Sequence, residues 1–342
     1  MTLPHPSDEP FLVADIGGTN ARFALAEITA GHPMLSRVQV LSCIDYPTLE
    51  EAIESYLRRQ GYSECTAACF AIAAPLTQRI VPFTNNHWVL DQDRLPARQG
   101  FKQFKLVNDF TAMALGVTAL TQDNCVSTNP EKDTKWQALP TQPRLVIGPG
   151  TGLGVSALIP LINEQHPSRQ EIRGWIPLST EGGHVAFAPT NEEEVAILRW
   201  LWQKYPRVSV ERLLCGEGLS NLYTAWSELT LEQSEARTPA AITEEALNNP
   251  ASLSHRVVQH FCRLLGQVTG DAALLTGARG GIYLCGGILP RILPLFQASD
   301  FRSALESKAR MQPFVQNIPS YVVTEPLTGL LGAALALSNP YA

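Results

Sequence analysis

The most constraining feature of this sequence is a short design that occurs twice: an apolar run, a glycine-rich turn and a second apolar run. The first copy covers residues 11–25 and turns at Gly17-Gly18, and the second covers residues 144–158 and turns within 148–154. Apolar runs of this length predict buried strands, and a glycine turn between them predicts a hairpin. Two copies of one hairpin predict a fold built from two related halves.

The rest of the chain alternates strand and helix patterns. A capping box, Thr48 with Glu51, predicts the start of the first helix. The apolar runs predict further strands over residues 38–43, 66–73, 80–83, 104–108, 280–285 and 318–323. The helical periodicity predicts helices over residues 48–59, 109–116, 192–205, 219–229, 243–248, 250–277 and 328–337. This alternation indicates an α/β sheet covered on both faces.

Size and charge narrow the functional classes. A chain of 342 residues suits two domains, and the polar, proline-containing stretch 120–143 is the expected boundary. The net charge of −6, with no basic stripe, argues against nucleic acid as a partner. No apolar run is long enough to cross a membrane, and the first ten residues have no signal-peptide pattern, so we expect a cytoplasmic protein.

The seven cysteines are scattered, and only Cys65 and Cys69 lie close together. No histidine follows that pair at zinc-finger spacing, so we expect reduced, buried thiols instead of a disulfide framework or a structural zinc site.

Glycine turns after strands predict phosphate binding, because backbone N–H groups can approach a phosphate where no Cβ intervenes. A third such turn, Gly286-Gly287, follows the apolar run at 282–285. Each turn alone is better explained as a tight hairpin, and three such turns after apolar runs are more specific. None fits the P-loop or the Rossmann fingerprint, which leaves a phosphate held between hairpin loops. Asp15, at the end of the first strand, is placed to hold a metal ion directly or through water.

Six motifs in chain order resemble bacterial glucokinases of the ATP-dependent, hexokinase-like type, and together they span nearly the whole chain. They are Asp15-Ile-Gly-Gly-Thr-Asn-Ala-Arg22, Asn108-Asp-Phe110, Gly150-Thr-Gly-Leu-Gly154, Glu181-Gly-Gly-His184, Val210-Glu-Arg212 and Gly286-Gly-Ile-Leu-Pro-Arg291. The resemblance implies an actin-like ATPase (ribonuclease-H-like) fold with small and large α/β domains around a central cleft. The small domain would comprise residues 1–119 and 325–342, and the large domain residues 120–324.

The same resemblance implies phosphorylation of glucose at its 6-hydroxyl by ATP with Mg²⁺, in a homodimer. Asp109 matches the general base. The residues matching the sugar site are Asn108, Glu181, His184 and Glu211, with Asn85 as a weaker candidate. The residues expected to hold ATP are Ala14, Asp15, Ile16, Gly17, Gly18, Thr19, Gly150, Thr151, Gly152, Gly286 and Gly287, with Asp15 also holding Mg²⁺ through water.

Taken alone, several of these residues have plainer explanations. Asp109 suits a helix N-cap, Glu211 the first turn of a helix, His184 a structural donor and Asn85 an Asx turn. Two other functions also stay open: a kinase for another hexose or an amino sugar, and a sugar-sensing regulator of the same fold.

Three further expectations concern the surroundings of the site. The run Glu192-Glu-Glu194 is typical of a solvated helix start, and Trp88 is expected in the core. The polar stretch 163–174 is expected to form a long hairpin tip.

Overall fold

The computed structural model describes residues 9–74, 76, 78–83, 86–129, 139–162, 172–231 and 235–342. The chain forms two compact units, one of residues 1–121, 158–179 and 325–342, the other of residues 122–157 and 180–324. Among the described residues, no helix has the length and apolar character that crossing a bilayer requires.

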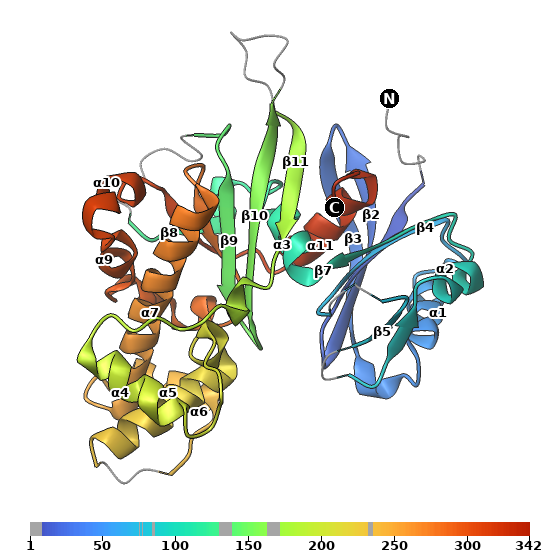
Figure 1. Ribbon diagram of the computed structural model, residues 1–342. Coiled ribbons are helices and arrows are strands. Elements are labelled where there is room, and N and C mark those ends of the chain that lie inside the picture. Colours follow the sequence, from blue (N-terminus) through green and yellow to red (C-terminus); the bar gives the residue numbers. More distant parts are fainter. Residues whose placement is uncertain are drawn as a thin grey trace. The chain divides into compact units, whose positions relative to one another are not determined.

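The first unit is built on a sheet with the strand order β3-β2-β1-β4-β7 (Figure 1). Its hairpin pairs β1 with β2 and β2 with β3 antiparallel, whereas β4 lies parallel to both β1 and β7. The strands are β1 (Phe11–Ile16), β2 (Asn20–Thr29), β3 (His32–Ser42), β4 (Ala67–Ile72) and β7 (Gln103–Asn108), with a small separate pair β5 (Ile80–Pro82) and β6 (Val89–Asp91).

Helices lie on both faces of this sheet. Leu12, Ala14 and Ile16 of β1 pack into the core shared with α1 (Leu49–Arg59) and α2 (Arg94–Gln99). The predicted cap of α1 is confirmed, since the Thr48 side chain accepts a hydrogen bond from the Glu51 N–H. Trp88 is buried in the same core, as expected.

The other face is covered by α3 (Asp109–Val117) and α11 (Thr328–Ser338), which touch at backbone distance. A Cβ at Gly332 would lie 1.6 Å from the Ala112 carbonyl oxygen, and one at Gly116 would lie 1.9 Å from the Thr328 carbonyl oxygen. No side chain fits in either place, so glycine sets the separation of the two helices.

The second sheet repeats the strand order of the first. It runs β11-β10-β9-β12-β13-β8, in which β12 is parallel to β9 and to β13. The strands are β8 (Cys125–Ser127), β9 (Arg144–Pro149), β10 (Leu153–Ile162), β11 (Ile172–Ser179), β12 (Ile282–Leu284) and β13 (Ser320–Val323). The predicted duplication of a strand–turn–strand hairpin is therefore confirmed.

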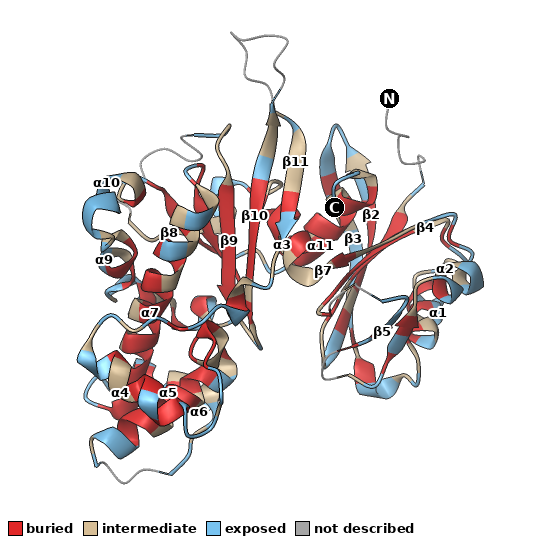
Figure 2. Ribbon diagram, viewed as in Figure 1, coloured by how far each residue is buried: buried red, intermediate tan, exposed pale blue. Residues whose placement is uncertain are grey.

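Helices account for most of the rest of the second unit, and buried residues run through them (Figure 2). The helices are α4 (Glu192–Leu201), α5 (Gly216–Leu229), α6 (Pro239–Asn248), α7 (Leu253–Thr276), α8 (Leu293–Gln297), α9 (Phe301–Glu306) and α10 (Gln312–Val315). Their apolar faces share one core with β9 and β12, including Ile147, Leu222, Phe261 and Leu284.

The units differ from the expected domains in one segment. Residues 158–179 were expected in the large domain but group with the first unit. The reason is tertiary: the Ser179 and Thr111 hydroxyls are 2.7 Å apart, and Asn339 Nδ2 donates to the Trp175 carbonyl at 2.9 Å. Most of the hairpin tip expected at 163–174 lies outside the described residues.

Candidate active site

Hydrogen bonds hold the first glycine turn in place, and two of them are accepted by its carbonyl oxygens. Gly17 N–H donates to the Asn20 carbonyl at 3.0 Å, which closes the turn between β1 and β2. The Gly17 carbonyl accepts from Asn86 Nδ2 at 3.3 Å, and the Thr19 carbonyl accepts from Cys43 N–H at 2.8 Å. Thr19 itself is exposed. The turn is thus rigid on its carbonyl side and accessible at its tip.

Asp15 lies at the end of β1, directly across the hairpin from Arg22. Its carboxylate is 3.6 Å from the Arg22 guanidinium, and burial raises the pKa of Asp15 while the Arg22 charge opposes that rise. The N-terminal turn of α11 also crowds it, since a Cβ at Gly329 would lie 3.0 Å from Asp15 Oδ2. Gly329 was not singled out in the sequence, although its small-residue surroundings, Thr-Gly-Leu-Leu-Gly-Ala-Ala, were a usable signal for close helix packing.

Asp15 suits a magnesium ion better than a protein-enclosed metal. Mg²⁺ in phosphoryl-transfer sites is held by one or two carboxylates together with waters and substrate phosphates. The described residues contain no cluster of three or more metal-ligating side chains.

Asn108 and Asp109 stand where β7 passes into α3. The Asn108 side chain caps the helix, with Oδ1 accepting from the N–H groups of Phe110 at 2.9 Å and Thr111 at 3.3 Å. Asn108 is therefore the N-cap, and Asp109 is the first helical residue, with its own Oδ1 also accepting from Phe110 N–H at 2.8 Å. Because β1, β4 and β7 are parallel, with Ile16 and Asn108 both paired to Ile72, Asp109 lies at the same sheet edge as the first glycine turn.

The second glycine turn is held on both sides. Gly150 N–H donates to the Gly152 carbonyl at 2.8 Å, and the Gly150 carbonyl accepts from Gly216 N–H at 2.9 Å. Leu153 N–H donates to Glu211 Oε2 at 2.8 Å. A carboxylate from a distant part of the sequence thereby takes part in shaping this turn.

A glycine pair brings the motif at 181–184 against β10. A Cβ at Gly183 would lie 2.1 Å from the Leu153 carbonyl oxygen, and one at Gly182 would lie 2.7 Å from Val155 Cβ. Without side chains at these positions, the 3₁₀ helix η3 (Gly182–His184) packs directly on the strand. The motif is therefore fixed beside the second glycine turn.

Three predicted sugar residues meet at this point. His184 Nε2 is 4.0 Å from Glu181 Oε2 and 4.0 Å from Glu211 Oε1, so the imidazole lies between two carboxylates. The side chains of Glu181 and His184 are more than half exposed, at 67% and 59%. Glu211 lies in the 3₁₀ helix η4 (Val210–Arg212), yet its carboxylate bonds the glycine turn. The cluster offers several hydrogen-bonding groups to a polyhydroxylated ligand.

The third glycine pair, Gly286-Gly287, lies at the edge of the second sheet that also bears the second glycine turn. A Cβ at Gly286, whose φ is +92°, would lie 2.5 Å from the Pro149 carbonyl oxygen at the end of β9. Gly287 has no heavy atom within 4 Å of a Cβ position. The structure thus places 286–287 next to the strand that leads into the turn at 150–152. Asn85, the weaker sugar candidate, lies outside the described residues.

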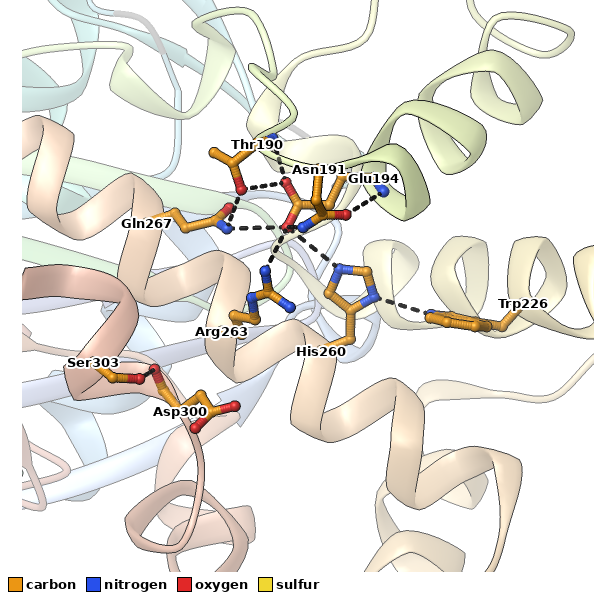
Figure 3. Close-up of polar contacts among 9 residues, drawn as sticks. All are labelled: Thr190, Asn191, Glu194, Trp226, His260, Arg263, Gln267, Asp300 and Ser303. Atoms are coloured by element: carbon orange, nitrogen blue, oxygen red, sulfur yellow. Dashed lines mark hydrogen bonds and ion pairs between the residues drawn. The ribbon is translucent and has the colours of Figure 1, made fainter. Parts of the chain in front are cut away.

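A buried polar cluster anchors the segment that follows His184 (Figure 3). Glu194, fully buried, accepts from Thr190 N–H at 2.6 Å, from Asn191 Nδ2 at 2.8 Å and from Gln267 Nε2 at 3.0 Å. His260 Nε2 and Arg263 lie 3.9 and 3.8 Å from its carboxylate.

The expectation that Glu192-Glu-Glu194 is a solvated helix start is wrong for Glu194. It is the third helical residue behind the Asn191 cap, where its side chain turns inward and satisfies backbone and side-chain donors.

Residues 12–340 match the glucokinase family profile. The chain belongs to the glucokinase family. The glucokinase of Marinobacter nauticus is 47% identical over 99% of this chain and 99% of its own length. That of Hahella chejuensis is 47% identical over 96% of this chain and 97% of its own length.

Solved structures confirm the expected actin-like ATPase fold. A glucokinase from an Antarctic psychrotroph has a TM-score of 0.83 at 30% identity, covering 97% of this chain and 99% of its own. A ROK family glucokinase from Streptomyces griseus, solved in complex with glucose and AMPPNP, has a TM-score of 0.58 at 17% identity, covering 95% of this chain and 98% of its own. At that identity the likeness concerns the fold alone.

Proposed function

We propose that this chain transfers the terminal phosphoryl group of ATP to the 6-hydroxyl of glucose, giving glucose 6-phosphate and ADP. Membership of the glucokinase family supports the reaction. The single observation that carries the mechanism is the position of Asp109, which follows the Asn108 cap at the sheet edge that bears the first glycine turn.

Asp109 is the proposed general base. Phosphoryl transfer proceeds through a loose transition state, so the alcohol proton leaves late and a carboxylate of ordinary basicity is strong enough to accept it. The Asp109 carboxylate accepts the 6-hydroxyl proton as the oxygen–phosphorus bond forms and the bond to the ADP leaving oxygen breaks.

Glucose is the proposed ligand of Asn108, Glu181, His184 and Glu211. The Asn108 amide oxygen is used by the helix cap, which leaves its NH₂ group to donate to a sugar hydroxyl. The two glutamates accept hydrogen bonds from hydroxyls, and the imidazole between them donates or accepts. A sugar analogue that lacks one of these hydroxyls leaves the corresponding protein group unpaired, so the site favours glucose over that analogue.

ATP is the proposed ligand of the glycine turns. The N–H groups of Gly17 and Gly150 close their own turns, so the other backbone N–H groups of the turns at Gly17–Thr19 and Gly150–Gly152 hold phosphate oxygens, and Gly286-Gly287 adjoins the nucleoside. Asp15 would hold Mg²⁺ through water, and the ion would neutralise charge on the terminal phosphates. Arg22 lies opposite Asp15, with its guanidinium 3.6 Å from the carboxylate.

The experiment that tests the proposal is a coupled assay with ATP, with and without Mg²⁺, over a panel of hexoses and amino sugars. Asp109→Asn should lower kcat about 10²- to 10⁴-fold, the usual contribution of a general base. Glucose affinity, measured by calorimetry, should change little, because the amide keeps the shape of the carboxylate. Asp123→Asn, an exposed carboxylate remote from the glycine turns in sequence, is the matched control and should keep wild-type turnover.

Other results would redirect the assignment. A higher kcat/KM for another sugar makes the chain a kinase of that sugar. Glucose binding without turnover on any sugar favours a regulator, and near-normal turnover of Asp109→Asn removes Asp109 as the base.

The proposal places the protein in the cytoplasm as a homodimer. Its free cysteines suit a reducing compartment, and the family resemblance supports the dimer. Cell fractionation and light scattering test the two statements separately.

A further inference from the structure

We infer that Glu211 couples glucose binding to the conformation of the phosphate-binding turn at 150–153. This inference rests on the proposed function, since it takes Glu211 as a sugar ligand and the turn as a phosphate ligand. Glu211 is then a positioning residue for the nucleotide as well as a contact for glucose.

The two carboxylate oxygens of Glu211 face different partners. Oε2 accepts from Leu153 N–H at 2.8 Å, at the last residue of the turn. Oε1 lies 4.0 Å from His184 Nε2, in the cluster proposed to hold glucose. The carboxylate is rigid and planar, so a rotation that improves the bond of one oxygen to glucose moves the other oxygen relative to the turn.

Gly152 lies directly against this carboxylate. A Cβ at position 152 would lie 2.6 Å from Glu211 Oε2 and 3.4 Å from its carboxyl carbon. The glycine is therefore required by a side chain from the sugar cluster and not only by the turn. Gly150, two residues earlier in the same turn, has no such neighbour, since the nearest heavy atom to its Cβ position is the Gly152 carbonyl oxygen at 3.9 Å.

Glu181 provides the internal comparison. It is the other carboxylate of the sugar cluster, 4.0 Å from His184, and its side chain is 67% exposed. Within the described residues its side chain makes an ion pair with His184 and no hydrogen bond or ion pair to the turn. The inference therefore predicts a cross-site effect for Glu211 and none for Glu181.

Coupling of this kind is reciprocal. If bound glucose fixes the Glu211 carboxylate in the orientation that holds Leu153, glucose must raise nucleotide affinity by the same factor by which nucleotide raises glucose affinity. Couplings of this type are typically about 5- to 150-fold.

The first test measures glucose binding without nucleotide, by calorimetry. Gly152→Ala should weaken glucose about 10-fold or more, because the new methyl group displaces Glu211, although residue 152 belongs to the phosphate turn. Gly150→Ala is the matched control and should leave glucose affinity within about twofold of wild type. A glucose affinity of Gly152→Ala equal to that of Gly150→Ala overturns the inference.

The second test does not depend on Gly152→Ala folding. AMPPNP with Mg²⁺ is titrated into wild type, Glu211→Gln and Glu181→Gln, each with and without saturating glucose. Glu211→Gln should weaken AMPPNP without glucose and abolish the gain that glucose gives, while Glu181→Gln should leave AMPPNP affinity unchanged without glucose. Equal AMPPNP affinities of the two variants overturn the inference. Failure of wild type to bind glucose at all would instead contradict the proposed function.

Discussion

The two glycine hairpins share a design but obtain their carboxylate differently. Each follows a six-residue strand, and the fifth residue of that strand is Asp15 in β1 and Gly148 in β9. The first hairpin thus carries its own acid, beside Arg22. The second has a glycine at the matching place and receives the Glu211 carboxylate from η4.

Under the proposed function, this difference separates two tasks within one duplicated architecture. A carboxylate on the strand itself is rigidly placed and suits a metal ion and charge neutralisation. A carboxylate supplied by another segment can sense a second ligand, because its position depends on what else that segment binds. Two copies of one hairpin can therefore differ in function through a single carboxylate, which comes from the strand itself in one copy and from another segment in the other.

The largest expected effect concerns the helix contacts behind the two sheets. Gly332→Ala should destabilise the first unit by about 3 kcal/mol or more, because its Cβ would overlap the Ala112 backbone oxygen at 1.6 Å. Gly270→Ala, in α7 of the second unit, should cost less, since its nearest atoms are the flexible end of Lys308 at 2.4 Å and the Leu305 oxygen at 2.5 Å. Thermal unfolding measures both.

Gly287→Ala is the control for both substitutions, because no heavy atom lies within 4 Å of its Cβ position. It should keep the wild-type unfolding temperature. If Gly332→Ala and Gly270→Ala destabilise equally, the first unit is not the more tightly constrained of the two.

The second effect concerns the two carboxylates. Asp15→Asn should lower kcat about 100-fold, or roughly 2.7 kcal/mol, by removing the charge that would hold Mg²⁺. Glucose affinity should hardly change, in contrast to the loss expected for Gly152→Ala. Turnover measured over a magnesium titration, beside glucose calorimetry, checks the separation of tasks. A loss of glucose affinity in Asp15→Asn would argue against it.

The smallest effect concerns acid stability, for which the two units also differ. His260 is buried in the second unit, and burial lowers its pKa to about 4, with the Glu194 charge opposing this and the Arg263 charge adding to it. In the first unit the comparable group is Asp15, whose pKa is raised by burial, so its protonation favours the folded state as the pH falls.

Because an unfolded histidine titrates near 6.5, protonation favours the unfolded state below that pH. The His260 contribution to stability is complete above pH 6.5 and is lost as the pH falls toward 4, by about 2 kcal/mol at pH 5. His260→Gln keeps an acceptor for Trp226 Nε1, which donates to His260 Nδ1 at 3.0 Å. Urea unfolding from pH 7 to 5 should show a flatter pH dependence in this variant, and an unchanged slope would contradict the assignment.

Local patterns in the sequence were sufficient for the hairpins, most helices and the family motifs. The capping choice at Asn108-Asp109 was not, because both residue types cap helices and only the backbone shows which one precedes the first helical residue. Glu194 did carry a signal: it lies three, four and seven residues before Ile197, Leu198 and Leu201, on the buried face of α4.

Other features depend on contacts that no local pattern contains. The grouping of residues 158–179 with the first unit depends on bonds to Thr111 and Asn339, which are far away in the sequence. The bond from Leu153 to Glu211 likewise joins two motifs that are each recognisable alone. The sequence predicted the candidate site residues, and the structure shows which of them lie in contact.

The packing of α11 on α3 has a consequence for how the protein is made. The first unit is incomplete until α11 arrives, and Gln103 and Lys105 of β7 also bond the carbonyls of Leu337 and Asn339 near the chain end. At ribosomal rates of about 5–20 residues per second, the interval between α3 and α11 takes roughly 10 to 40 s. During that time one face of the nascent first sheet is uncovered while the second unit is synthesised. Synthesis of the first unit therefore begins before that of the second unit and ends after it.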